Sequence, residues 1–277
     1  MIGRELVAAL RESKLDDVAP PFLWSDVELL RFLNYAEVQA CRRAHLIIDW
    51  TTANDSGTAA TAGTFGQKPL CVLSVIADQA TYNLSPKILQ VRRCQLKSMT
   101  YPLIGPVTHA ELDERLAGWW GTAGTVLSSG TGGATTSSWT AGTSATGGTH
   151  ATSGTLITAL LGGQPDYFIN EPTNTLTLVL SPSANDTAYL VVSRIPLIPF
   201  TLQTSPEIEE KYHEGLMDWA AYLAFKKPDS DTLNLNLAAL YEKEFTAQFG
   251  PLPDAYSEKM KKTISMQGRM RPRVFGS

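Results

Sequence analysis

The apolar positions divide the chain into three regions, and the first, residues 1–50, has the period of α-helix. Ser25-Asp26-Val27-Glu28 predicts a capping box at a helix start, with Leu23 or Trp24 packing on the first turn. Apolar residues then recur at helical intervals, so this helix is expected to run to about Asp49. The recurring positions are Leu30, Leu33, Ala40, Cys41, Ala44, Ile47 and Ile48.

A second helical region, residues 205–250, predicts a hairpin of two helices. Ser205-Pro206-Glu207 is typical of a helix start, with an N-cap, a proline and an acidic first turn. Lys226-Lys227-Pro228 is typical of its end, and Ser230 or Asp231 is expected to cap the next helix, which ends before Gly250-Pro251. Short turns favour antiparallel packing, and the helix from 25 to 48 is expected to join as a third member.

Between the helical regions, residues 51–204 are expected to form an inserted β domain that begins with a small-residue linker, 51–67. Four short β-branched runs predict strands of a small antiparallel sheet or sandwich, separated by turn-forming residues. Thr175–Leu178 alternates polar and apolar positions, as a half-buried strand does. The expected class is therefore α+β, an antiparallel helical bundle with a β insertion. The four runs are CVLSVIA (71–77), ILQVRRCQL (88–96), TLTLVL (175–180) and AYLVVSRI (188–195).

A Gly/Thr/Ser-rich segment at about 121–160 interrupts the β domain and contains no Asp, Glu, Lys or Arg. Its small apolar surface cannot offset the entropy of ordering its backbone, which favours a flexible loop. Threonine also favours strand, so an ordered β-arm that pairs with a neighbour stays open as the alternative.

Charge changes the picture at the C-terminal end, where residues 251–277 are expected to form an extended basic tail. The whole chain of 277 residues has a formal net charge of −4, so without the six cations after Glu258 residues 1–258 carry −4 − 6 = −10. A solvated end, an extended peptide in an acidic groove of a partner, and phosphate contacts with DNA are the alternatives. The candidate residues are Lys259, Lys261, Lys262, Arg269, Arg271, Arg273, Val274 and Phe275.

Cys41, Cys71 and Cys94 form no CxxC pair or Cys/His cluster, so they are expected to be buried free thiols in a reduced intracellular setting. The start of the chain lacks the continuous apolar stretch of a signal peptide. No run approaches 18 apolar residues, so no membrane span is expected.

Candidate catalytic groups are few. His213-Glu214 lacks a second histidine at zinc-peptidase spacing and is interpreted as an exposed or capping pair. Asp229-Ser230-Asp231 lacks the rest of a calcium loop and is interpreted as helix punctuation. Glu111, Asp113 and Glu114 could supply paired carboxylates, but Thr108 and Glu111 also predict a capping box for a short helix ending at Trp119-Trp120. We therefore expect no enzyme, with no catalytic residue, cofactor or metal.

Four blocks, in order along the chain, resemble the head-to-tail adaptor (connector) proteins of tailed bacteriophages, of the short-tailed type. The resemblance covers most of residues 22–250, and the uncharged insertion departs from the family pattern. The blocks are WSDVELLRFLNYAEVQACRRAHLI, YNLSPKILQVRRCQL, QPDYFINEPTNTLTLVLSPSANDTAYLVVSRIP and PEIEEKYHEGLMDWAAYLAFKKPDSDTLNLNLAALYEKEFTAQFG.

The resemblance implies a structural protein of the virion neck, present in the host cytoplasm during assembly. Such adaptors form a ring, usually of twelve copies, beneath the portal, and their β part faces the tail nozzle or fibres. Their C-terminal tail reaches the portal, and DNA passes through the lumen during ejection without sequence-specific binding. In such a ring the segment 121–160 could pair with a neighbouring adaptor or a tail protein.

Two other functions stay open at this point. One is a glycan- or fibre-binding tail module whose Thr/Gly-rich segment makes the contact. The other is a peptidoglycan hydrolase that uses Glu111 or Asp113.

Overall fold

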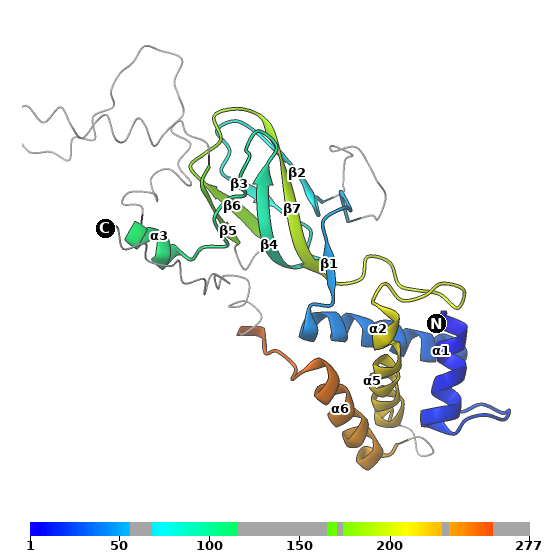
Figure 1. Ribbon diagram of the computed structural model, residues 1–277. Coiled ribbons are helices and arrows are strands. Elements are labelled where there is room, and N and C mark those ends of the chain that lie inside the picture. The colour runs from blue at the N-terminus through cyan, green and yellow to red at the C-terminus, as the bar shows by residue number, and fades with distance from the viewer. Residues whose placement is uncertain (56–67, 116–164, 171–173, 229–232, 257–277) are drawn as a thin grey trace, which may run out of the picture. The chain divides into compact units, whose positions relative to one another are not determined.

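The computed structural model describes residues 1–55, 68–115, 165–170, 174–228 and 233–256, and its mixed helices and antiparallel strands confirm the α+β class (Figure 1). The chain divides into two compact units. The first unit contains Met1–Val72, Leu84–Arg92 and the described residues from 190 onward; the second contains Leu73–Asn83 and Arg93–Tyr189. The domain boundaries expected from the sequence stay a prediction.

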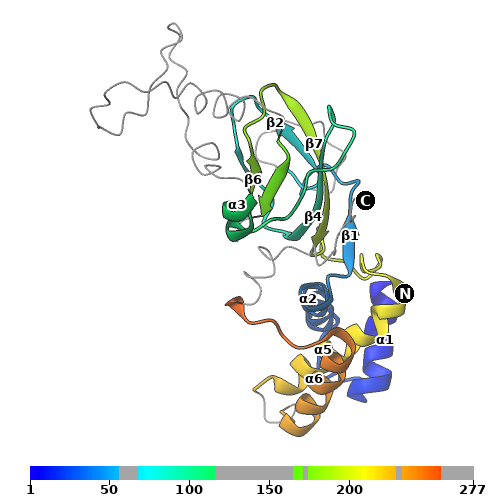
Figure 2. The same cartoon turned by 60° about the vertical axis from the view of Figure 1, so that its left-hand side comes forward.

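The helices of the first unit share one hydrophobic core. In this core, α1 (Gly3–Leu10) and a π-helical turn, η1 (Arg11–Leu15), pack against α5 (His213–Lys226). Helices α2 (Asp26–Ala44) and α6 (Leu235–Phe249) also pack on α5, α6 on the side away from α1 (Figures 1 and 2).

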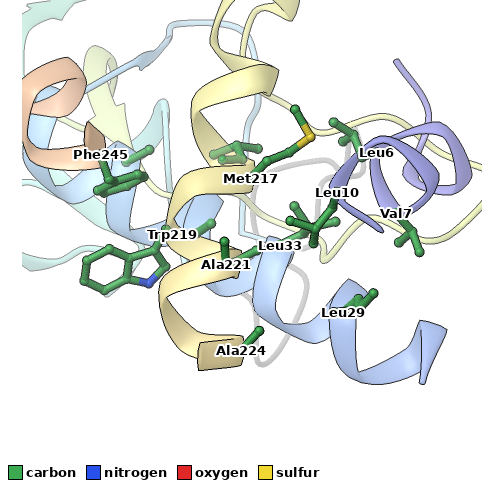
Figure 3. Packing of buried hydrophobic residues seen from close by; sticks show 14 of the residues in the cluster. Leu6, Val7, Leu10, Leu29, Leu33, Met217, Trp219, Ala221, Ala224 and Phe245 are labelled. Atoms are coloured by element: carbon green, nitrogen blue, oxygen red, sulfur yellow. The ribbon is translucent and has the colours of Figure 1, made fainter. Parts of the chain in front are cut away.

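Apolar residues from each helix meet in this core because they lie three or four positions apart. Leu29 and Leu33 of α2 and Leu6 and Leu10 of α1 are fully buried. Figure 3 shows Leu6 next to Met217 and Leu10 next to Leu33, with Leu29 farther along α2. Small residues line α5 at its contacts. At Gly215 an added Cβ would lie 1.8 Å from the side chain of Gln248 and 2.8 Å from the Phe249 ring, so α6 packs closely on α5 and a larger residue would have to displace these side chains.

The start of α2 confirms Ser25 of the predicted capping box as the N-cap, whereas the Glu28 side chain pairs with Lys227. The end of the helix corrects the prediction. The Ser25 side chain accepts a hydrogen bond from the Glu28 amide, and Trp24 rather than Leu23 is buried. The helix does not reach Asp49, because His45 adopts a left-handed conformation (φ 50°) after Ala44. The next residues form strand β1 (Ile47–Asp49) instead.

The predicted start of the hairpin is wrong. Residues 205–209 are not helical; a short 3₁₀ turn, η3 (Glu210–Tyr212), leads into α5. The amide of Glu207 donates to Glu37, and its carboxylate accepts from the Leu197 amide, so tertiary contacts use the groups that a helix start would need.

The predicted cap of the second hairpin helix is also wrong, although both helix ends are confirmed. Helix α5 ends at Lys226 and α6 at Phe249, before Gly250. Asn234 caps α6 by accepting a hydrogen bond from the Leu237 amide at 3.2 Å. Asp229, Ser230 and Asp231 lie outside the described residues.

The strands form two sheets. In one, β7 (Asp186–Arg194) pairs with β1, β2 (Val72–Val75) and β4 (Ile88–Leu96). The other has the order β3-β6-β5 and is antiparallel, with β3 at Thr81–Asn83, β5 at Tyr167–Asn170 and β6 at Thr175–Val179. The four predicted strands are all present, and β1, β3 and β5 were missed because they are short.

Strand β6 is not half-buried as its alternating sequence predicts. Thr177 is buried with its neighbours Leu176 and Leu178, so both faces of β6, the central strand of its sheet, are covered. A central strand can be covered on both faces, so alternation of residue type does not decide exposure.

The second unit also contains a short helix, α3 (His109–Arg115), next to a small apolar cluster of Val107, Leu112, Ile169 and Val179. Its predicted capping box is confirmed: Thr108 N donates to Glu111 Oε2 at 2.8 Å, and Glu111 N donates to Thr108 Oγ1 at 3.2 Å. The predicted helix end at Trp119-Trp120 lies outside the described residues.

Candidate interaction site

An open groove of about 330 Å³ lies between α2 and α5 in the first unit. Phe32 of α2 and Leu223 of α5 give it an apolar floor, and both side chains also pack against the helical core. Charged side chains form the rest of its lining. The lining residues are Glu28, Arg31, Phe32, Leu223, Lys226 and Lys227.

Cations dominate the rim of this groove. Glu28 Oε1 lies 3.1 Å from Lys227 Nζ and 4.0 Å from Arg31 Nη2, so one carboxylate forms ion pairs with two cations. Lys226 Nζ donates to the Tyr222 hydroxyl at 2.7 Å, and this bond is the main cause of the raised pKa of Lys226. The side chain of Arg31 is 74% exposed. The groove therefore offers an apolar floor and exposed positive charge, which suits a partner with an apolar side chain beside carboxylates.

A network of charged side chains holds the segment that leads into α5. Arg194 on β7 donates to Asp49 at 2.8 Å and to Glu207 at 2.5 Å. Burial opposes ionisation of Asp49, but hydrogen bonds from Thr51 and Thr52 and the Arg194 guanidinium together hold its pKa below the usual range. The network fixes residues 195–209 and thereby the position at which α5 begins.

Glu37 on α2 completes this network from the core side. It is 1% exposed, and its Oε1 accepts hydrogen bonds from the amides of Glu207 at 2.6 Å and Ile208 at 3.3 Å. Burial raises the pKa of Glu37 to about 7, although both amides and nearby Arg194 favour its ionised form. Glu37 is therefore a buried acid whose ionisation costs stability.

Arg43 links α2 to the end of α6. Its guanidinium lies over the rings of Trp219 and Phe245, and it donates to Thr246 and to the Gly250 carbonyl, both at 3.0 Å. Burial lowers the pKa of Arg43. These contacts make Arg43 a packing residue that fixes α6 on α5 and α2.

Comparison with known proteins identifies the family. A family model described as SU10 adaptor protein matches residues 1–273. The chain belongs to this family. The match confirms the head-to-tail adaptor resemblance and makes the protein a phage structural adaptor and a virion component. No curated protein matches the adaptor.

Two segments that the sequence predicts to contact partners lie outside the part of the chain that the structure describes. Lys259, Lys261, Lys262, Arg269, Arg271, Arg273, Val274 and Phe275 all lie outside the described residues, as does the Gly/Thr/Ser-rich segment 121–160.

Three of the candidate catalytic groups lie on α3 in the second unit. Glu111 accepts hydrogen bonds from the amide and the hydroxyl of Thr108 and so caps the helix. Asp113 and Glu114 are exposed on α3. The interpretation of His213 as exposed is wrong: it is 3% exposed, and its Nε2 lies 3.1 Å from the Ile208 carbonyl oxygen. Burial lowers the pKa of His213. Its contact with the Ile208 carbonyl oxygen ties the segment before η3 to the start of α5.

The three thiols are buried and free, as predicted. Burial raises the pKa of Cys71 and of Cys94 to about 12 and that of Cys41 further, so all three are protonated and poorly nucleophilic. In the described part of the chain, no group of three or more His, Cys, Asp and Glu could hold a metal ion. Within the same ranges, no helix is long and apolar enough to cross a membrane.

Sequence reasoning missed the groove because its two walls come from distant segments. Lys226 and Lys227 were noted only as cations at a helix end, whereas Arg31 and Phe32 belong to a helix almost 200 residues earlier. The adjacent Arg31 and Phe32, in the second turn of the predicted helix, were the available signal.

Proposed function

We propose that this adaptor forms a ring, of twelve copies, that joins the portal to the tail nozzle or fibres and lines part of the DNA ejection channel. The family match over residues 1–273 is the observation that carries the proposal. An adaptor must offer separate surfaces to its neighbours, and the groove between α2 and α5 supplies one of them.

The basic tail is the proposed portal anchor. Its six cations and the apolar Val274 and Phe275 follow an otherwise acidic chain, so charge would guide the tail to an acidic partner surface and the apolar side chains would hold it there. The antiparallel order of the helical bundle and the inserted β domain also stay predictions within this proposal. DNA would pass an acidic lumen without specific binding.

The test is binding of the full chain and of a 1–258 truncation to isolated portal rings, measured by sedimentation at low and moderate salt. We expect the full chain to add a fixed number of copies and the truncation to lose at least tenfold in affinity, roughly 1.4 kcal/mol. Two further variants separate the contributions of the tail: Lys259, Lys261 and Lys262 to Gln for charge, and Val274 and Phe275 to Ser for apolar contact.

A matched control removes three exposed cations elsewhere, at Arg4, Lys68 and Lys211. Salt should weaken portal binding by the full chain, because screening reduces the contribution of the exposed cations. The difference in affinity between the full chain and the variant with Lys259, Lys261 and Lys262 changed to Gln should therefore become smaller. Equal binding of truncation and full chain would show that the tail is not the anchor. Failure of both to bind would contradict the portal-adaptor proposal itself.

A further inference from the structure

A second surface of the first unit carries the opposite charge to the groove and a partly exposed leucine. Leu240 on α6 is 48% exposed, and Glu244, one helical turn later, is exposed beside it. Lys14 Nζ lies 2.8 Å from Asp218 Oδ1 and 3.6 Å from Glu244 Oε2. Together with the exposed Glu214 and Lys243, this acidic surface holds three carboxylates, of which Asp218 is buried, and two lysines, a formal charge of −3 + 2 = −1.

The carboxylates of the acidic surface lie close enough to act on one another. Burial is the main cause of the raised pKa of Asp218, and the charges of Glu244 and Glu214 raise it further. Lys14 opposes them and Lys243 adds a second cation, so three acids meet two lysines. The surface therefore retains negative charge around a partly exposed leucine.

The groove has the opposite charge. Arg31, Lys226 and Lys227 share its lining with Glu28, for a formal charge of +3 − 1 = +2. Glu242 adds a carboxylate in the vicinity, but it is the smallest of the influences on the pKa of Lys226. Unlike the acidic surface, the groove has a recess with an apolar floor that an exposed leucine side chain can enter.

The two surfaces lie on different sides of α5. Leu223 comes nine residues after Glu214, which is about two and a half turns of helix, so their side chains point in opposite directions. One copy of the chain can therefore use both surfaces at the same time.

We infer that a second copy of this chain occupies the groove through its acidic surface. Leu240 of one copy would cover Phe32 and Leu223 of the next, with Glu244 and Glu214 facing Arg31 and Lys226. Because the two surfaces differ, the contact is head-to-tail and its repetition closes a ring or extends a filament. This inference rests on the proposed ring-forming function and names the surfaces that would form the ring.

Charge also decides against the tail of this chain as the occupant. Residues 259–277 carry six cations and no Asp or Glu, so they would meet the positive rim with like charge. Residues 1–258 carry −10 and offer each copy an acidic neighbour.

The first experiment measures self-association of the full chain by sedimentation velocity over a range of protein concentrations. Arg31→Glu reverses the groove and Glu244→Lys reverses the acidic surface, and each is expected to weaken association at least about tenfold through like-charge contact. Leu240→Ser should weaken association without a change of charge. Arg4→Glu and Glu114→Lys reverse exposed charges outside both surfaces and should leave association unchanged.

The decisive arm mixes the two charge-reversal variants. In an equimolar mixture each Arg31→Glu groove can take a Glu244→Lys surface, and each unchanged groove can take an unchanged acidic surface. Alternating assemblies should therefore form in the mixture but not in either variant alone. Thermal unfolding of each variant identifies a misfolded one, in which case Lys226→Glu and Glu214→Lys replace the pair.

Two results would overturn the inference: a wild-type chain that stays monomeric at every concentration, or a mixture that associates no better than its components. Portal binding is measured separately. Normal portal binding without rescue in the mixture would refute these surfaces and leave the adaptor function standing. Rescue without portal binding would support the surfaces and contradict the portal-adaptor proposal.

Discussion

The two compact units bury different kinds of residue. The first unit encloses several charged side chains, among them Arg11, Glu37, Asp49 and Arg194, each at most 8% exposed. Among the described residues of the second unit, the buried polar side chains are the neutral Asn170 and Thr177. The first unit is thus held by apolar packing together with ion pairs, and the second by apolar packing and backbone ladders.

This difference follows from what each unit must fix in place. The first unit joins segments far apart in the sequence through irregular connections, such as residues 16–25 and 195–209, whose amides need partners. Arg11 holds one connection through Asp17, Asp26 and the Trp24 carbonyl oxygen. Arg194 and Glu37 hold the other. A charged side chain can form several hydrogen bonds at once. Such groups also make the stability of the first unit sensitive to pH and to the loss of a single partner.

Removing Arg194 should have the largest effect. Arg194→Met leaves Asp49 buried and Glu207 without its cation, and we expect a loss of about 3–5 kcal/mol in the free energy of unfolding. Urea denaturation followed by tryptophan fluorescence measures it. Arg93→Met on β4 is the matched control, because Arg93 is exposed and bonds only to Gln95 among the contacts described. A loss below about 1 kcal/mol at Arg194 would contradict the role given to the network.

Glu37 should make the stability of the first unit fall as pH rises. Its pKa is raised from 4.5 to about 7 on folding, so between these values the unfolded chain has released the proton that the folded chain keeps. The contribution of Glu37 to stability is then largest below pH 4.5 and falls by about 1.4 kcal/mol per pH unit up to pH 7, about 3 kcal/mol in all.

Glu37→Gln tests this, because its carbonyl oxygen can still accept from the amides of Glu207 and Ile208 but cannot ionise. The difference in unfolding free energy between variant and wild type should therefore move in favour of the variant as pH rises from 5 to 8. A constant difference over this range would show that Glu37 does not carry the effect. Glu114→Gln, an exposed acid of α3, serves as the control.

The sequence was sufficient for elements defined by local rules. Ser25 caps α2, Gly250 follows α6, and the β-branched runs became strands, because each signal depends on a few neighbouring residues. Ser205-Pro206-Glu207 is an equally good local signal, yet Arg194 and the Leu197 amide take up the Glu207 carboxylate. Tertiary bonding replaced the local preference there.

The candidate site could be predicted only in part for the same reason. The charge distribution predicts a basic tail after an acidic chain, and four segments of sequence indicate the family. The groove needed Arg31 and Phe32 to meet Leu223 and Lys226, and no periodic pattern reports which faces of two helices lie together. The buried state of Glu37 was hidden too, because a glutamate within a helix is ordinarily solvated.

The smallest expected effect belongs to the second unit. Leu112 is 0% exposed, but its cluster contains few other buried side chains, so Leu112→Ala should cost about 2 kcal/mol, at the low end for such a change. Because the cluster around Leu112 is apolar, the cost should be equal at pH 5 and pH 8, in contrast to Glu37. Hydrogen exchange localises the change: amides of β5 and β6 should exchange faster, whereas those of α2 and α5 should not. Faster exchange throughout the helices would show that the two units do not respond separately.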